Sequence, residues 1–372
     1  MSTLRNKCLV ACFCLVICLP TLDQVLGLSA FQTMENKGSA WPTTNAGSGI
    51  RALKKAARHF DTYYKTNFGG RNVLIYLHSL LYYYGLSESP VPAQVVIGKA
   101  GWLYVGDYHN RVVQQHRGLF PLHPDSARAI AQHLLAVQRK LAGRGAKLYV
   151  MIAPDSHSIY PEHLPDHLLP GQLPETPLDV LSRAMHHHPA LPFMNLRDTL
   201  CRAKQHQRVY WPTDSHWNSY GALAGSTVVL NRIRHDFPAI RPIQAADYRT
   251  GLASDKPSDL LALMMLQGQN SQLHQAIGMK PALWSAATHQ LVREEPTRQQ
   301  AAVYLGIDVR QPSLLLFGDS FSEAMMDQLP AYFGRSTTLH QSIIDWPRVD
   351  REKPDVVIVE IVERNLYNLS RL

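Results

Sequence analysis

LLLFGDSFSEAM, residues 314–325, is the stretch that decides the fold class of this chain. Four apolar residues run directly into Gly318, Asp319 and Ser320, and a helix-like segment follows. A short, uniformly apolar run of this kind predicts a strand that is buried on both faces of a sheet. Ser320 then has two interpretations: it is a nucleophile at the end of that strand, or it is a helix N-cap, a position at which serine is common.

The rest of the chain repeats this strand pattern. Three uniformly apolar runs are expected to be buried strands: 146–154, 312–318 and 355–363. Two amphipathic segments are expected to be helices: 126–145 and 219–237. Ser126 is the predicted N-cap of the first helix, and Asn218 or Ser219 that of the second. Apolar strands that alternate with helices predict an α/β domain whose parallel sheet is covered on both faces.

We expect this domain to occupy residues 91–372, after a helical lead-in at 31–90. The remaining segments have weaker patterns. A helix is expected at 73–84, ended by Gly85, and a hairpin at 91–107. Residues 238–311 are a possible insertion with loops over the site. A helix with a kink near Pro330 is expected at 322–334.

Asp214 and His216 supply the polar pair that a serine nucleophile requires. They lie two positions apart in YWPTDSHWNSYGA, residues 210–222, so in an extended segment both side chains point to the same side. The carboxylate can then hold one imidazole nitrogen while the other nitrogen faces a hydroxyl group, as in a catalytic triad. With this pair present, Ser320 is the predicted nucleophile and Ser322 the predicted cap. In the alternative interpretation, Asp214 is a turn residue and His216 a packed polar group.

A third polar segment, MIAPDSHSIYPEHLP at 151–165, follows a predicted strand and therefore borders the same edge of the sheet. Asp155, His157 and Tyr160 are candidate substrate contacts, or Asp155 and Ser156 merely form a turn. His157 is also the rival to His216 as the base, but it lacks the aromatic frame that Trp217 gives His216.

The composition excludes several classes of function. The 372 residues carry a net charge of +8, with 45% hydrophobic and 18% charged residues, a mixture found in globular proteins. The basic residues form no stripe interleaved with aromatics, so nucleic acid is not an expected partner. Four of the five cysteines share one N-terminal apolar run and Cys201 is alone, so we expect no disulfide framework in the body of the protein. We expect no metal and no cofactor.

Residues 1–30 have the features of a targeting segment. Arg5 and Lys7 form a positive start, and an apolar stretch at 8–19 ends at Pro20. A stretch of 12 residues is short for a bilayer span, which favours a cleaved signal peptide. The absence of an A-x-A cleavage site favours an uncleaved membrane anchor instead. In either case the body of the protein is exported, and the positive start stays inside.

The order and spacing of the motifs resemble the SGNH (GDSL-type) hydrolase-like family, specifically its alginate O-acetyltransferase branch (AlgJ and AlgX). The matching segments span most of the chain: VVIGKAGWLYVGD, the residues around 152–165, TDSHWN, LLLFGDSF and PDVVIVEIVERNL. In ordinary members the serine block comes first, whereas here Asp214 and His216 precede Ser320, as in the circularly permuted alginate branch. We expect a chain of the single-domain AlgJ type, because no carbohydrate-binding segment follows Leu372.

The resemblance implies an SGNH-like three-layer fold and a role for each motif residue. Ser320 would be the nucleophile, His216 the base, and Asp214 the residue that orients the base. The terminal motif of Glu360, Glu363 and Arg364 would be structural or adjacent to substrate. Ser156 stands where relatives often have lysine, so no substrate contact is carried over to it. The expected substrate contacts are His157, Tyr160, Trp217 and Arg364.

The resemblance also implies a function: a periplasmic O-acetyltransferase that acts through an acetyl-serine on hydroxyls of an exopolysaccharide, alginate-like or other. Acetyl-CoA does not reach the periplasm, so the donor partner would be a membrane-bound O-acyltransferase, beside other proteins of an exopolysaccharide complex. Anchorage in the inner membrane by residues 1–30 is one expected arrangement. Two alternatives stay open: a periplasmic carbohydrate acetyl esterase with the same triad, and a non-catalytic subunit of an export or modification complex.

Overall fold

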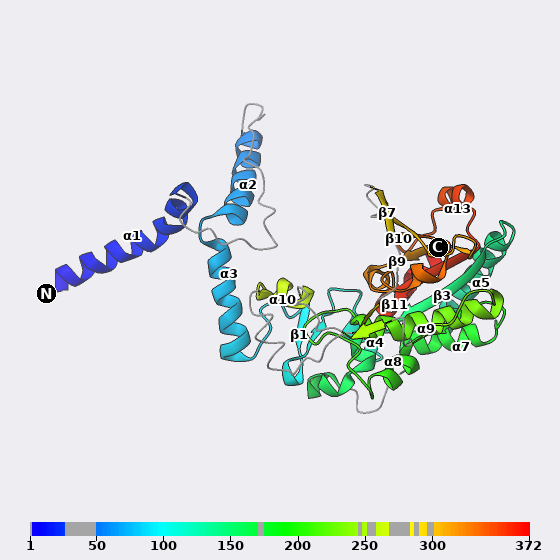
Figure 1. Cartoon of the computed structure of the whole chain (residues 1–372). Helices are drawn as coiled ribbons and strands as arrows, with labels where there is room; N and C mark the ends of the chain where they lie inside the picture. The colour runs from blue at the N-terminus through cyan, green and yellow to red at the C-terminus, as the bar shows by residue number, and fades with distance from the viewer. Residues whose placement is uncertain are drawn as a thin grey trace. The chain divides into compact units, whose positions relative to one another are not determined.

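The structure is a computed structural model that describes residues 2–26, 50–169, 175–244, 248–250, 258–267, 283–285, 290–295 and 301–372 (Figure 1). The chain divides into two compact units. One comprises Met1–Val91 with Leu261–Gly268, and the other comprises Pro92–Leu260 with Gln269–Leu372. The second unit contains all of the predicted strands.

A seven-stranded sheet forms the centre of the second unit, in the order β4-β3-β11-β9-β10-β8-β7. The first five strands in this order are parallel to one another. β8 pairs antiparallel with β10, and β7 pairs antiparallel with β8. The strands are β3 (Lys147–Ala153), β4 (Phe193–Asn195), β7 (Gln290–Glu295), β8 (Ala301–Leu305), β9 (Ser313–Gly318), β10 (Arg335–His340) and β11 (Val356–Val362). The three strands predicted from the sequence are confirmed, and they lie side by side at the middle of the sheet as β3, β11 and β9.

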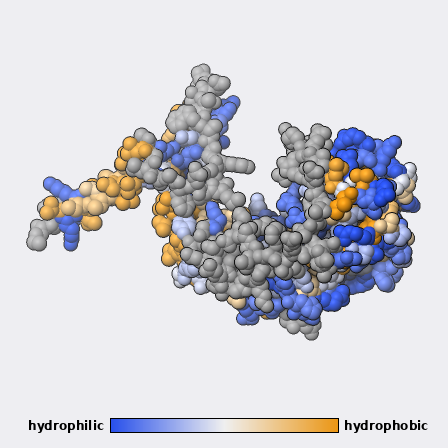
Figure 2. All heavy atoms as spheres, in the orientation of Figure 1, coloured by the Kyte–Doolittle hydropathy of each residue, from blue (hydrophilic) through white to orange (hydrophobic). Residues whose placement is uncertain are grey.

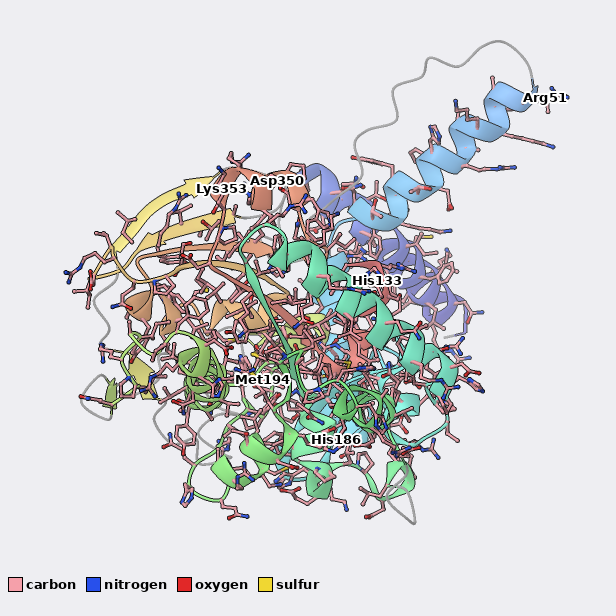
Figure 3. The ribbon with its side chains drawn as sticks, turned by 90° about the vertical axis from the view of Figure 1, so that its right-hand side faces the viewer. Arg51, His133, His186, Met194, Asp350 and Lys353 are labelled. Carbon is pink, nitrogen blue, oxygen red and sulfur yellow. The ribbon has the colours of Figure 1, made fainter. Side chains whose placement is uncertain are left out.

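Helices cover both faces of this sheet. Because side chains alternate along a strand, Leu314 and Leu316 of β9 pack on the core with α8 and α9, whereas Leu315 and Phe317 pack on the core with α5 and α7. Figure 3 shows α5, which carries His133, lying over the strands. These helices are α5 (Pro124–Ala142), α7 (Pro177–His186), α8 (Arg197–Ala203) and α9 (Ser219–Asp236). The α/β class and its three layers are therefore confirmed.

Part of the region expected to be an insertion belongs to the sheet. β7 and β8 lie within 238–311 and extend the sheet beyond β10. Their antiparallel pairing explains why the alternation of apolar strands and helices did not extend to them. The same region contributes β5 (Tyr248–Thr250) and β6 (Leu283–Ser285), which pair with each other, and α10 (Asp259–Leu263). Much of the rest of 238–311 lies outside the described residues.

Several predicted helix boundaries differ from the structure. α5 begins at Pro124, so Ser126 is not its cap; instead the His123 ring accepts the Asp125 N–H, and proline is well placed in a first turn. The predicted cap of α9 is confirmed, since Asn218 Oδ1 accepts the Gly221 N–H. The helix predicted at 322–334 is wrong. The structure has a short α12 (Ser320–Glu323) and, after five further residues, a 3₁₀ turn, η7 (Leu329–Tyr332), which has Pro330 in its first turn.

The predicted hairpin at 91–107 is confirmed. β1 (Val95–Ile97) pairs antiparallel with β2 (Leu103–Val105) across a 3₁₀ turn, η2 (Lys99–Gly101). Gly101 has a φ of 77°, a conformation that favours glycine. The hairpin places the Val105 carbonyl near the end of β3, as described below.

The first unit is helical. Its helices are α1 (Ser2–Leu26), α2 (Ile50–Asn67), α3 (Arg71–Leu80) and a π-helical continuation, η1 (Leu81–Leu86). α1 contains 21 residues, Leu4–Gln24, that are long and apolar enough to cross a membrane, a test that a signal sequence also passes. Pro20 does not end this segment, since the helix continues to Leu26. Gly85 does not end the helix predicted at 73–84. It lies within η1, which ends at Leu86 and is followed by Ser87 with a φ of 56°.

Candidate active site

Ser320 lies two residues beyond the end of β9, at the first position of α12. The turn that leads to it leaves room only for glycine at 318, where a Cβ would lie 2.5 Å from the Ser322 Cβ and 3.0 Å from Glu360 Oε2. Asp319 fixes the turn. Its Oδ1 accepts the Phe321 N–H at 3.0 Å, and its Oδ2 accepts the Val362 N–H at 2.9 Å. The serine hydroxyl is thus held at the carboxyl edge of the sheet, where ligands bind in open α/β sheets.

Asp319, not Ser322, is the cap of α12. The Asp319 side chain accepts from the backbone, whereas the Ser322 hydroxyl donates to the Asp319 carbonyl at 2.7 Å. The prediction that Ser322 caps the helix is therefore wrong. It failed because the helix starts two residues earlier than the apolar pattern indicated, which makes Ser320 the first helical residue.

His216 lies between Ser320 and Asp214. Its Nε2 is 2.7 Å from Ser320 Oγ, and its Nδ1 is 2.7 Å from Asp214 Oδ1. An ionised carboxylate only accepts hydrogen bonds, so we assign the imidazole proton to Nδ1, and Nε2 is left to accept the Ser320 hydroxyl proton. The Asp214 and His216 side chains meet, as predicted, but the segment is a bend and not extended, and the His216 N–H also donates to Asp214 Oδ1 at 2.9 Å. This chain of hydrogen bonds has the geometry required of a nucleophile, a base and the group that orients the base.

Asp259 is a second carboxylate beside the same imidazole. Its Oδ2 lies 3.6 Å from His216 Nδ1, and its N–H donates to Asp214 Oδ2 at 3.1 Å. It also accepts the Ser215 N–H at 2.8 Å and the Ser215 hydroxyl. Partial burial and the neighbouring Asp214 charge raise the pKa of Asp259. Asp259 was not predicted from the sequence, where its only signal is an acidic residue at the start of a short apolar run.

Phe321 and Trp217 tie the serine turn to the histidine segment. The Trp217 indole N–H donates to the Phe321 carbonyl at 3.0 Å, and the Phe321 ring lies 5.0 Å from the His216 ring between centroids. Trp217 is buried, with 1% of its surface exposed. It lies in the predicted aromatic frame, but as a packed wall behind His216 and not as an exposed surface.

A family model described as "SGNH hydrolase-like domain, acetyltransferase AlgX" matches residues 95–341 of the chain. The chain belongs to this family. The AlgX-family match includes Asp214, His216 and Ser320, and it confirms the resemblance inferred from the sequence.

Two curated relatives have the same printed name, "Probable alginate O-acetylase AlgJ". The Pseudomonas aeruginosa relative is 27% identical over 277 residues, which is 72% of this chain and 65% of the relative. The Pseudomonas syringae pv. tomato relative is 25% identical over 248 residues, which is 64% of this chain and 58% of the relative. The chain therefore spans less than two thirds of the length of each. Among solved structures, Bacillus cereus PatB1 superposes with a TM-score of 0.53 at 14% identity, over 73% of this chain and 96% of that one, which shows a shared fold.

His157 and Tyr160, two other predicted site residues of this AlgX-family domain, follow β3 and bond backbone groups instead of Ser320. His157 is 3% exposed, its Nε2 is 3.0 Å from the Val105 carbonyl, and its ring stacks on His116. Tyr160 is buried and its hydroxyl accepts the Val209 N–H at 3.0 Å. His216 and not His157 therefore contacts the serine, so the rival base is wrong.

Arg364 takes part in a network of buried ion pairs at the ends of β3 and β11. Its guanidinium donates to Asp155 Oδ1, and its backbone N–H donates to Asp155 Oδ2 at 2.9 Å. Burial alone would raise the pKa of Asp155, but the Arg364 and His116 charges together hold it well below its usual range. Glu363 continues the network through Arg197, at 2.6 Å. Arg364 also lies 5.6 Å from the Phe321 ring centroid, so its guanidinium borders the serine turn.

Glu360 of β11 contacts the serine turn at Asp319. It is fully buried, and its Oε2 accepts the Asp319 N–H at 3.1 Å. Burial and the Asp319 charge raise the pKa of Glu360 well above its ordinary value. The Glu360 carboxyl group supports the turn from below through this hydrogen bond.

Two groups of side chains bring three possible metal ligands close together among the described residues. They are Asp214, His216 and Asp259, and His116, Asp155 and Glu363. In the first group the His216 nitrogens already face Asp214 and Ser320. In the second, Arg364 and Arg197 already neutralise the carboxylates. The carboxylates of both groups are thus engaged by protein atoms, whereas the buried His116 Nε2 has no hydrogen-bond partner within the described part of the chain and lies 3.7 Å from Asp155 Oδ2.

Proposed function

We propose that this chain is an O-acetyltransferase that moves an acetyl group through an acetyl-Ser320 intermediate onto a hydroxyl of an exopolysaccharide. The observation that carries the proposal is the 2.7 Å contact between His216 Nε2 and Ser320 Oγ, with Asp214 held on the other ring nitrogen. The AlgX family match and the name of the curated relatives support acetyl transfer as the reaction and an alginate-like polymer as the acceptor.

In the first step, Ser320 Oγ attacks the acetyl carbonyl carbon of the donor ester while its proton passes to His216 Nε2. The tetrahedral intermediate carries an oxyanion. The Ser320 N–H lies at the first helical position, which has no intrahelical acceptor, and is one donor for that oxyanion. The bond to the donor oxygen then breaks, and the leaving group takes the proton from His216. Acetyl-Ser320 remains.

In the second step, a sugar hydroxyl attacks the acetyl carbon of acetyl-Ser320 and gives its proton to His216 Nε2. The bond to Ser320 Oγ breaks, and the serine takes the proton back. Asp214 stabilises the imidazolium in both steps and does not itself take the proton. His216 is 17% exposed and Ser320 is partly exposed, so an acceptor from solution can reach both.

The proposal places the reaction on the outer side of the inner membrane, in the periplasm. Arg5 and Lys7 at the start of α1 favour an inside position for the N-terminus, and the rest of the chain follows α1 outward. The donor partner would be a membrane-bound O-acyltransferase, with other proteins of an exopolysaccharide complex beside it. The net charge of +8 suits an anionic acceptor such as a uronate polymer.

The test is a partition experiment with an acetyl ester donor, with and without a uronate oligosaccharide. Acetylated oligosaccharide and free acetate are both measured, by mass spectrometry and by enzymatic assay. We expect acceptor-dependent acetylation that falls by at least about a thousandfold in Ser320→Ala. Ser322→Ala is the matched control, because that hydroxyl lies on the same turn but bonds only the Asp319 carbonyl.

Each alternative function has its own result. Acetate release that ignores the acceptor would indicate an esterase with the same three residues. Acetylation that is unchanged in Ser320→Ala would leave only a non-catalytic role in a complex.

A further inference from the structure

α2 separates its charged and apolar residues onto opposite faces. At 100° per residue, its basic side chains fall on one side and its apolar and aromatic side chains on the other. The basic face carries Arg51, Lys54, Lys55, Arg58 and Lys65. The apolar face carries Ile50, Leu53, Ala57, Phe60 and Tyr64. With Asp61 as its one acidic residue, the helix has a net charge of +4.

The apolar face of α2 is uncovered. Ile50 is 74% exposed, Leu53 71% and Phe60 51%, and none of the 18 residues of the helix is buried. Figure 3 draws the α2 side chains extending outward from the helix, with Arg51 in the first turn. A helix of this length is marginal in water unless another surface covers its apolar side.

Hydrogen bonds join the C-terminal end of α2 to the C-terminal part of α1. The Gly69 N–H donates to the Pro20 carbonyl at 3.0 Å, and Gln24 Nε2 donates to the Tyr63 hydroxyl at 3.2 Å. The Thr21 and Tyr64 hydroxyls lie 3.2 Å apart. Figure 2 shows that α1 is hydrophobic over most of its length. If its 21-residue apolar window spans a bilayer, residues 20–24 lie at the membrane surface, and the tyrosines of α2 lie at the level where aromatic residues are enriched.

We infer that α2 lies flat on an anionic phospholipid bilayer. Its apolar face enters the boundary between headgroups and acyl chains, and its basic face binds lipid phosphates. Charge complementarity favours lipid as the occupant. Five positive side chains line one face, and the single carboxylate, Asp61, is already paired with Lys65 at 2.7 Å. This inference concerns the first unit alone, and it does not depend on the proposed acetyl transfer.

The experiment is hydrogen exchange of the full chain in lipid nanodiscs, read for the amides of residues 50–67. Discs of phosphatidylcholine alone are compared with discs that also contain phosphatidylglycerol. We expect the anionic lipid to slow exchange in α2 by at least about tenfold. Lys54→Glu with Arg58→Glu should abolish that effect, whereas Leu53→Ser with Phe60→Ser should raise exchange in both lipids.

The matched control is Arg335→Glu with Arg351→Glu, which changes the net charge equally at two exposed arginines of the second unit. It should leave the lipid effect intact. All variants should have the circular dichroism spectrum and the urea midpoint of the parent chain, which shows that they are folded. Equal exchange in the two lipids would overturn the inference, and so would insensitivity to Lys54→Glu with Arg58→Glu. Protection of α2 that appears only when another membrane protein is added would overturn it in favour of a protein partner.

Discussion

The ends of β9 and of β3 lie at the same edge of one sheet, yet their polar residues are satisfied in different ways. At β9, Ser320, His216 and Asp214 form a linear chain of hydrogen bonds that ends in a partly exposed hydroxyl. At β3, the Asp155 carboxylate accepts from both the guanidinium and the backbone N–H of Arg364, and 1% of its side chain is exposed. The first cluster can pass a proton to and from a substrate, whereas the second has its charges already neutralised.

This difference explains why two Asp-x-His sequences have different consequences. Asp155 and His157 have the same spacing as Asp214 and His216. The first pair opens a helical turn, α6 (Ser156–Ile159), so its side chains diverge: Asp155 turns to Arg364 and His157 to the Val105 carbonyl. The second pair lies in a bend where the His216 N–H also donates to Asp214 Oδ1 at 2.9 Å, so its side chains meet. Spacing alone therefore does not identify a base, and the local backbone conformation decides.

The largest expected effect comes from replacing each of the two histidines, His216 and His157, by glutamine in separate variants. His216→Gln should lower the acetylation rate by at least about a thousandfold, because the Ser320 proton then has no acceptor of suitable basicity. His157→Gln should change it by no more than a few-fold, since His157 contacts neither Ser320 nor Asp214. The measurement is kcat with an acetyl ester donor, normalised to folded protein. Equal losses in the two variants would show that the clusters are not functionally distinct.

The next effect concerns stability. Arg364→Met should lower the free energy of unfolding by about 3 kcal/mol, because it leaves the Asp155 carboxylate buried and unpaired. The double variant Arg364→Met with Asp155→Asn removes both charges and should recover part of that loss. The measurement is urea denaturation followed by circular dichroism. A loss below about 0.5 kcal/mol, the size expected of an exposed pair, would contradict the buried network.

The polar residues that follow β3, Asp155 and His157 among them, should also make the stability of the fold fall at a pH above the range in which carboxylates titrate. Burial and the neighbouring His116 lower the pKa of His157 to about 3, so the native chain keeps this ring neutral. The unfolded chain protonates it below pH 6.5, the ordinary value. Stability from this group is therefore present at neutral pH and falls as pH drops from 6.5 toward 3.

Between pH 6.5 and 5 this loss should amount to about 2 kcal/mol, at roughly 1.4 kcal/mol per pH unit. Asp155 does not contribute in this window, because its pKa is held below its usual range. His157→Gln keeps a donor for the Val105 carbonyl but cannot titrate. Its unfolding free energy, measured across the same range, should be flatter than that of the parent by this amount. Parallel curves would show that His157 is not a neutral buried ring in the native chain.

The sequence predicted the features that local pattern determines. The apolar runs identified β3, β9 and β11, and the two-residue spacing identified Asp214 and His216. Features that depend on distant pairing were not predictable in this way. β7 and β8 join the sheet through antiparallel pairing with β10, and Trp217 packs behind His216 where a substrate contact was expected. Asp259 comes to His216 from 43 residues further along the chain.

Asp259 provides the smallest and most discriminating prediction, because it tests which carboxylate of the β9 cluster orients the base. Asp214 lies 2.7 Å from His216 Nδ1 and Asp259 lies 3.6 Å away, so only Asp214 makes a direct hydrogen bond. Asp214→Asn should therefore cost much more than Asp259→Asn, for which we expect a loss of about tenfold in kcat. Asp259→Asn keeps the oxygen that accepts the Ser215 N–H, and its amide nitrogen can donate to the Ser215 hydroxyl, so its effect mainly reports the lost charge. If the two variants are equally impaired, the imidazole shares both carboxylates; if Asp259→Asn alone is impaired, Asp259 is the orienting group and the assignment of Asp214 is wrong.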